Sequence, residues 1–142
     1  RLSRVGFEKM KGCLKGGYEA WKNANEPIDM IIDVEADELI MDIPHDPNLL
    51  VVDVRKETEW ADGHLADAMN LPLNEMTDVV QLAQFEEHQN LYSHCAGGYR
   101  SVIAASLLKR EGVNNIRNVL GGWNSIKTME KAKIVKDTKV LN

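Results

Sequence analysis

Cysteine is scarce in this sequence, with only Cys13 and Cys95 among 142 residues. Two cysteines do not supply the disulfide framework that holds small secreted domains together. No apolar stretch approaches the about 20 residues that a helix needs to cross a bilayer. A secretory signal peptide is also absent, although the sequence starts at Arg1, so that absence excludes little. These features lead us to expect a cytoplasmic protein.

Basic residues are in a minority, with 17 Lys and Arg against 22 Asp and Glu. This balance argues against a nucleic-acid backbone as the main partner, because phosphate binding needs an excess of positive charge. Apolar residues make up 44% of the sequence and charged residues 27%, which is typical of a globular protein and does not favour disorder. The length suits one domain with a substantial core.

Acidic residues are absent from residues 91–110, which instead carry His94, Arg100, Lys109 and Arg110. A cationic segment in an acidic chain suits an anionic ligand. Lys109 and Arg110 have a simpler explanation, because basic residues complement the negative end of a helix. Arg100 lies at the opposite end of the segment, so this explanation does not cover it.

The same segment predicts a strand, a tight loop and a helix. Apolar residues precede Cys95, two glycines follow it, and a later apolar run ends near Gly112, which suits a helix C-terminus. A helix N-terminus offers unpaired N–H donors, and Gly97 and Gly98 permit backbone conformations that let such donors converge. Arg100 adds a permanent positive charge. The loop therefore predicts a stabilised anion, either the Cys95 thiolate or a charged group bound beside it.

Several loop residues have more than one interpretation. Cys95 is either a buried structural thiol or, as its place at a strand end before a helix favours, a reactive thiol with a lowered pKa. The Ser101 hydroxyl either donates to this thiolate or caps the helix. We expect Ala96 and Tyr99 at the rim, where a substrate would be selected. We expect His94 to point into the sheet or pair locally, with proton transfer as the lesser alternative.

The loop Cys-Ala-Gly-Gly-Tyr-Arg resembles the active-site loop of rhodaneses, which are sulfurtransferases. Further segments resemble the family in the family's own order, so that the likeness covers roughly residues 30–128; they are residues 51–55, 59–65, 68–73 and 119–123. The resemblance implies an α/β fold, a three-layer α/β/α domain around a central, mainly parallel sheet.

The resemblance also implies a chemistry: Cys95 accepts a sulfane sulfur as a persulfide, with no cofactor and no metal. The donor would be thiosulfate or glutathione persulfide, and the acceptor cyanide or a thiol. Asp53 and Arg55 are implied as structural support, joined by a salt bridge beneath the loop, and Glu59 and its neighbours Trp60 and His64 as framework. The implied substrate-binding residues are Ala96, Gly97, Gly98, Tyr99, Arg100 and Ser101.

Two other functions stay open. Rhodanese-like domains often serve as non-catalytic binding or regulatory modules, but such copies usually lack the cysteine that is present here. Phosphatases and arsenate reductases of the same fold have one more residue between cysteine and arginine, which makes room for a tetrahedral phosphate. The shorter loop from Cys95 to Arg100 matches sulfur instead.

The start of the chain resembles a later part of it, with Gly16-Gly17 matching Gly121-Gly122 and Cys13 falling on a strand-core position. We therefore expect residues 1–29 to be the truncated tail of a preceding rhodanese-like repeat plus a linker. Residues 30–131 would form the complete domain and residues 132–142 a C-terminal tail. The sequence around Gly16 also resembles the junction in bacterial proteins that fuse a metallo-β-lactamase-like domain to rhodanese-like domains, so upstream domains of a parent protein are expected partners.

Apolar patterns predict the remaining elements. Asp33 is expected to cap the first helix of the complete domain. The predicted strands are residues 30–32, 49–54, 68–71 and 116–120, and the predicted helices are residues 36–41, 56–63, 74–85 and 123–131.

Overall fold

The computed structural model describes residues 8–137 and divides the chain into two units between Met30 and Ile31. The described part of the first unit contains one helix, α1 (Gly17–Asn23), and none of its residues is buried. Cys13 is exposed and lies outside any strand, so the prediction of a strand-core position for it is wrong. The physical reason is that, among residues 8–137, this segment pairs with no strand of either sheet.

The second unit is built on a five-stranded sheet in which every pair is parallel. Its strands, in spatial order, are β1 (Ile32–Val34), β6 (Ile116–Val119), β5 (Asn90–His94), β2 (Leu49–Asp53) and β4 (Met69–Asn70). Two short strands, β3 (His64–Leu65) and β7 (Ile134–Val135), form a separate antiparallel pair. Because β5 is central, the residues after it lie at the middle of the sheet's carboxyl edge, where ligands bind in open α/β sheets.

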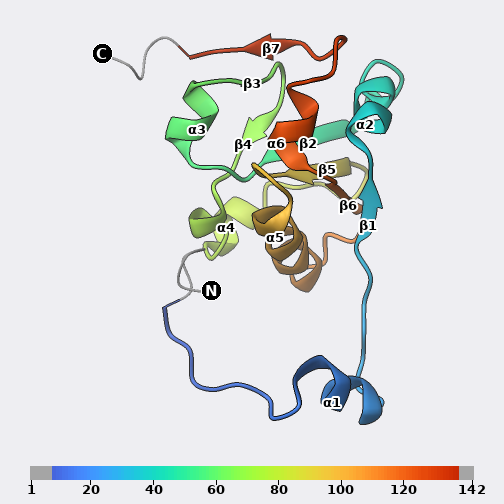
Figure 1. Ribbon diagram of the computed structural model, residues 1–142, viewed down its shortest axis with the longest axis vertical. Coiled ribbons are helices and arrows are strands. Elements are labelled where there is room, and N and C mark those ends of the chain that lie inside the picture. The colour runs from blue at the N-terminus through green and yellow to red at the C-terminus, as the bar shows by residue number, and fades with distance from the viewer. Residues whose placement is uncertain (1–7, 138–142) are drawn as a thin grey trace. The chain divides into compact units, whose positions relative to one another are not determined.

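Helices cover both faces of the sheet, which confirms the predicted α/β fold. Figure 1 shows α2 (Ala36–Asp42) and α6 (Gly122–Ile126) on one side of the strands and α5 (Tyr99–Arg110) on the other. Three further helices belong to the unit: α3 (Glu57–Ala61), η2 (Leu73–Glu75) and α4 (Val79–Leu82). Within residues 8–137, no helix is both long enough and apolar enough to cross a membrane.

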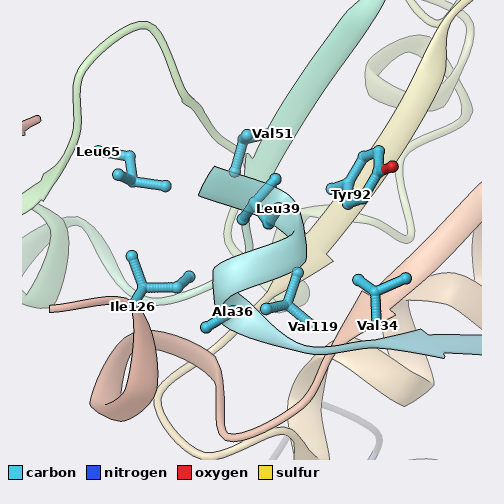
Figure 2. Close-up of a cluster of buried hydrophobic side chains, with 8 residues drawn as sticks. All are labelled: Val34, Ala36, Leu39, Val51, Leu65, Tyr92, Val119 and Ile126. Atoms are coloured by element: carbon cyan, nitrogen blue, oxygen red, sulfur yellow. The ribbon is translucent and has the colours of Figure 1, made fainter. Parts of the chain in front are cut away.

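A cluster of buried side chains joins α2 and α6 to the sheet (Figure 2). Leu39 of α2, Val119 of β6 and Ile126 of α6 are completely inaccessible. Alternate residues of a strand point to opposite faces, so Val51 and Tyr92 face this cluster, whereas Val52 and Leu91 face α5. Burial on both faces explains why β2 and the start of β5 appear in the sequence as apolar runs.

Two helix starts differ from their predictions. Glu35, not Asp33, caps α2, because the Glu35 and Glu38 side chains each bond the other's backbone N–H. Asp33 lies within β1, which begins at Ile32 rather than at Met30, and its carboxylate accepts a hydrogen bond from Asn118 Nδ2 at 2.8 Å.

Two predicted helices are shorter than expected. Residues 74–85 form η2 and α4 instead of one helix, because the Asp78 carboxylate accepts a bond from the Val80 N–H and starts the second one. The helix predicted for residues 123–131 is α6, which ends at Ile126. There the Thr128 hydroxyl donates to the Ser125 carbonyl and competes with a helical bond.

Replacing Leu39 by Ala tests the core, because Leu39 is fully buried between α2 and the sheet. We expect the free energy of unfolding in urea to fall by about 2–5 kcal/mol, the usual effect of a large cavity. Met41→Ala is the control, since Met41 lies on the same helix but is 60% exposed. Equal losses in the two variants would contradict this description of the core.

Candidate active site

Cys95 lies directly after β5, and the loop from Ala96 to Gly98 leads into α5. Gly98 is the N-cap of α5 and has a φ of 105°, a conformation that favours glycine. This turn aims the Gly98 N–H at the Cys95 Sγ, at 3.1 Å. The Ser101 Oγ lies 3.6 Å from the same sulfur. The loop and the first turn of α5 thus surround the sulfur with donors, as the sequence predicts.

These donors change the ionisation of the thiol. Burial by itself raises the pKa of the Cys95 thiol, because it removes the thiolate from water. The N–H and hydroxyl of Ser101 and the N–H groups of Gly98 and Gly97 act in the opposite direction and outweigh it. The pKa of Cys95 is therefore lowered from its ordinary value of 9.0, the direction that increases the nucleophilic thiolate at neutral pH.

The Ser101 hydroxyl also belongs to a buried polar chain. It lies 2.6 Å from Asn118 Oδ1, and Asn118 in turn donates to Asp33. The Gly98 carbonyl lies 3.1 Å from the same hydroxyl, so its one proton is donated to Asn118, to Gly98 or to the Cys95 sulfur at a given moment. The capping interpretation of Ser101 is wrong, because Gly98 is the cap of α5 and no side chain caps it. Asn118 was missed, although a polar residue between apolar positions of β6 was a signal for it.

Arg100 forms an ion pair with Glu59 through both of its terminal nitrogens. The Nη1–Oε2 distance is 2.7 Å and the Nη2–Oε1 distance is 2.8 Å, so two parallel hydrogen bonds join α5 to α3. Glu59 raises the pKa of Arg100, and Arg100 lowers the pKa of Glu59. The Cys95 thiolate also raises the pKa of Arg100, to a smaller extent. The family resemblance implied Glu59 as a framework residue, and no pattern in the sequence indicated this partner 41 residues away.

Asp53 and Arg55 form the expected salt bridge, and both are buried. Arg55 Nη2 donates to Asp53 Oδ2 at 2.6 Å and to the Gly63 carbonyl at 2.8 Å. The guanidinium also lies 4.5 Å from the centroid of the Trp123 ring. The pair therefore ties the end of β2 to the turn before β3 and to the start of α6.

His94 is fully buried, with Nδ1 3.2 Å from the Cys95 carbonyl oxygen. Its Nε2 lies 3.7 Å from Asp53 Oδ2 and has no hydrogen-bond partner among the described residues. Burial lowers the pKa of His94, and the nearby Asp53 only partly opposes this effect. A neutral imidazole without contact with solvent does not suit a proton carrier, which agrees with the expectation that His94 points into the sheet.

Cys95 is less accessible than the sequence indicates, since only 2% of the residue is exposed. The N-terminus of α6 closes one side, where the Trp123 N–H donates to the Cys95 carbonyl at 2.7 Å and the Asn124 N–H to the Ala96 carbonyl at 3.0 Å. Of the two residues expected at the rim, Tyr99 is exposed and Ala96 is only partly exposed, and Gly97 between them is exposed as well. The sulfur thus lies at the floor of the loop rather than at its edge.

Gly122 permits this close approach of α6 to the loop. Its φ is 53°, and a Cβ at this position would lie within van der Waals overlap of the Cys95 carbonyl oxygen. A larger residue would push the loop away from α6 or strain its own backbone. The second glycine of the Gly121-Gly122 pair is therefore required by contact with the loop.

Comparison with known proteins agrees with this fold. The model of the family described as "Rhodanese-like domain" matches residues 35–129, which is more than half of the chain. The "Putative sulfur carrier protein YrkF" of Bacillus subtilis is 27% identical over 108 residues, covering 76% of this chain and 55% of that protein. The tRNA uridine(34) hydroxylase of Escherichia coli is 27% identical over 81 residues, covering 54% of this chain and 23% of that protein. The chain thus spans about half of the first relative and under a quarter of the second.

Solved structures give the same result. The rhodanese-like domain of an Anabaena protein matches with a TM-score of 0.67 at 23% identity, over 75% of this chain and 80% of that one. A rhodanese-related protein of Thermoplasma volcanium matches with a TM-score of 0.63 at 29% identity, over 73% of this chain and 97% of that one. At 23% identity, the first of these likenesses shows the fold alone.

Gly122→Ala is expected to lower the free energy of unfolding by about 1–3 kcal/mol, because it adds both backbone strain and a clash with the Cys95 carbonyl. Gly112→Ala is the matched control, since Gly112 has a φ of 93° but no atom within 4 Å of the added Cβ. The measurement is the free energy of unfolding of both variants in urea. Gly112→Ala reports the effect of backbone strain, and the additional loss in Gly122→Ala reports the effect of the clash. A loss in Gly122→Ala no larger than in Gly112→Ala would show that the contact with the loop is unimportant.

Ser101→Ala is expected to raise the pKa of Cys95, because it removes the hydroxyl that lowers it. Alkylation of Cys95 by iodoacetamide should slow about tenfold at pH 6, the size of one hydrogen bond to a charged group. The measurement is the pH dependence of the alkylation rate, in a Cys13→Ser background. Ser106→Ala is the control, since Ser106 lies on α5 and its hydroxyl donates to the Val102 carbonyl, away from the Cys95 sulfur. An unchanged profile in Ser101→Ala would contradict the role of this hydroxyl.

Proposed function

Because the chain belongs to the rhodanese-like domain family, we propose that it is a sulfurtransferase that carries a sulfane sulfur as a persulfide on Cys95. The observation that supports this most strongly is the set of donors around the sulfur: the N–H and hydroxyl of Ser101, and the Gly98 N–H at 3.1 Å. They lower the pKa of the thiol in spite of its burial. No general base is then needed, which fits the burial of His94 away from solvent.

The first half of the reaction is an attack of the Cys95 thiolate on the outer sulfur of the donor. With thiosulfate, a new S–S bond forms to Cys95 while the S–S bond of thiosulfate breaks, and its electron pair leaves with sulfite. With glutathione persulfide, the leaving group is the glutathione thiolate instead. The N–H groups that stabilise the thiolate also face the persulfide anion that replaces it, so one set of donors serves both states.

The second half returns the enzyme to its starting state. A nucleophilic acceptor attacks the terminal sulfur of the Cys95 persulfide, and the electron pair of the breaking S–S bond returns to the Cys95 sulfur. Cyanide would leave as thiocyanate, and a thiolate would leave as a new persulfide. Since the two substrates react in separate steps through a covalent intermediate, the kinetics should be ping-pong.

We also propose that this domain is part of a longer protein. In this proposal residues 1–29 end a preceding rhodanese-like repeat of a longer bacterial protein in the cytoplasm. The upstream domains of that protein, a metallo-β-lactamase-like domain among them, would be partners of this one. Backbone conformation supports the repeat: Gly16 and Gly121 are both left-handed N-caps, with φ of 85° and 69°. The next residues, Gly17 and Gly122, are left-handed as well, with φ of 58° and 53°.

A second candidate is a binding or regulatory module without turnover. Two observations favour it: Cys95 is only 2% exposed, and both terminal nitrogens of Arg100 are bound to Glu59. In such a module the loop would hold its shape but would not exchange sulfur. The two candidates differ in whether Cys95 reacts with a donor at all.

Intact-mass measurement after incubation with thiosulfate separates the two candidates. We expect the protein to gain one sulfur, because the Cys95 thiolate is ionised, and to lose it when cyanide is added. Cys95→Ser should gain none, and Cys13→Ser should behave like the unaltered protein, since Cys13 is exposed and lies outside the loop. Absence of the gain with both thiosulfate and glutathione persulfide, or a gain that persists in Cys95→Ser, would contradict sulfur transfer through Cys95.

A further inference from the structure

Glu59 is the partner of the cation in the Cys95 loop. Its carboxylate bonds both terminal nitrogens of Arg100 at 2.7 and 2.8 Å, and the two side chains are only 34% and 23% exposed. The Lys56 N–H also donates to Glu59 Oε2 at 3.1 Å, which holds the carboxylate in place at the start of α3. Glu59 is therefore positioned by its own helix to meet Arg100.

This ion pair removes most of the positive charge that the loop would offer to a donor. The Arg100 guanidinium is the cation in the loop sequence, and the nearby Arg55 is already neutralised by Asp53. With Glu59 ionised, the Cys95 thiolate, Arg100 and Glu59 together are negative. The N–H groups that remain are dipoles, which stabilise one negative sulfur without adding net charge.

The proposed donors differ in the charge that they bring to this group. Thiosulfate carries two negative charges on the sulfur–sulfur unit that must approach Cys95. An organic persulfide is neutral or singly charged at its sulfur–sulfur unit, and its other charges lie further away on the organic part. Repulsion by a negative site therefore acts more strongly on thiosulfate than on a persulfide.

We propose that Glu59 makes this site selective for organic persulfides over thiosulfate, by neutralising Arg100. This inference rests on the proposed sulfurtransferase function and names its donor class. The Cys95 thiolate attacks the terminal sulfur of R–S–SH, a Cys95–sulfur bond forms, and the donor's S–S bond breaks with its electron pair leaving on R–S⁻. The proton stays on the transferred sulfur and is then released to solvent. Glu59 is a positioning residue, since it acts through Arg100.

Glu59→Gln tests this directly, because glutamine has the same shape and keeps an oxygen for Arg100 but has no charge. The measurement is the second-order rate constant for Cys95 persulfide formation, by rapid quench and intact mass, with thiosulfate and with glutathione persulfide. We expect the thiosulfate constant to rise about tenfold and the persulfide constant to change less than about threefold. Glu57→Gln is the matched control, since it removes the same charge from an exposed position of α3.

Two further measurements distinguish an effect of the Glu59 charge from a role of Glu59 in folding alone. Glu59→Asp keeps the charge with a shorter side chain, so it should keep the preference for the persulfide. In Glu59→Gln the pH of half-maximal Cys95 alkylation should fall, because the Arg100 charge is no longer cancelled, whereas Glu57→Gln should leave it unchanged. A role in folding alone would lower stability without moving the donor ratio or this pH.

Salt dependence in the unaltered protein keeps the inference testable if Glu59→Gln does not fold. Salt screens repulsion between charges, so the thiosulfate constant should rise with ionic strength relative to the persulfide constant. A fall with salt would show attraction to an uncancelled cation and would overturn the inference. An equal donor ratio in Glu59→Gln and Glu57→Gln would overturn it while leaving sulfur transfer intact. No sulfur gain from either donor in the unaltered protein would overturn both the inference and the proposed function.

Discussion

The hydrogen bonds from the loop and α5 to the Cys95 sulfur are the interaction on which the site depends. Burial of a thiol ordinarily favours its neutral form, and Cys95 is almost completely buried. The donors of Gly97, Gly98 and Ser101 reverse this effect and lower the pKa. If they were displaced, the same burial would leave an inert structural cysteine. The chemistry of the domain is therefore set by the geometry of a few backbone N–H groups.

Several unrelated contacts hold that geometry. Cys95 lies at the carboxyl edge of the parallel sheet. The N-terminus of α6 donates a hydrogen bond to the Cys95 carbonyl, and this close approach is possible because Gly122 has no side chain. Below the loop, the buried pair of Asp53 and Arg55 joins β2 to the turn before β3. On its outer side, Glu59 holds Arg100. The loop is thus fixed from three directions. Its N–H groups therefore stay aimed at the Cys95 sulfur before a sulfur donor binds.

Local pattern explains what could be predicted from the sequence. Apolar runs bounded by charge or glycine identified the parallel strands, and the glycines after Cys95 identified the loop at a helix start. Elements with weak sequence patterns were not predicted: β3 and β7 have only two residues each. The single helix predicted for residues 74–85 is two helices, because Asp78 starts the second one. The pairing of Glu59 with Arg100 was beyond sequence reasoning, because two exposed-looking charges 41 residues apart leave no periodic signal. The depth of Cys95 depends on how α6 packs, which no local pattern records.

Titration of Cys95 tests the account most directly. In a Cys13→Ser background with ¹³C-labelled cysteine, the Cβ chemical shift of Cys95 reports its ionisation by NMR. The account predicts that the thiol loses its proton below the ordinary value of 9.0, because the loop donors outweigh burial. A transition at or above 9.0 would show that burial dominates, and Cys95 would then be a structural residue of the fold.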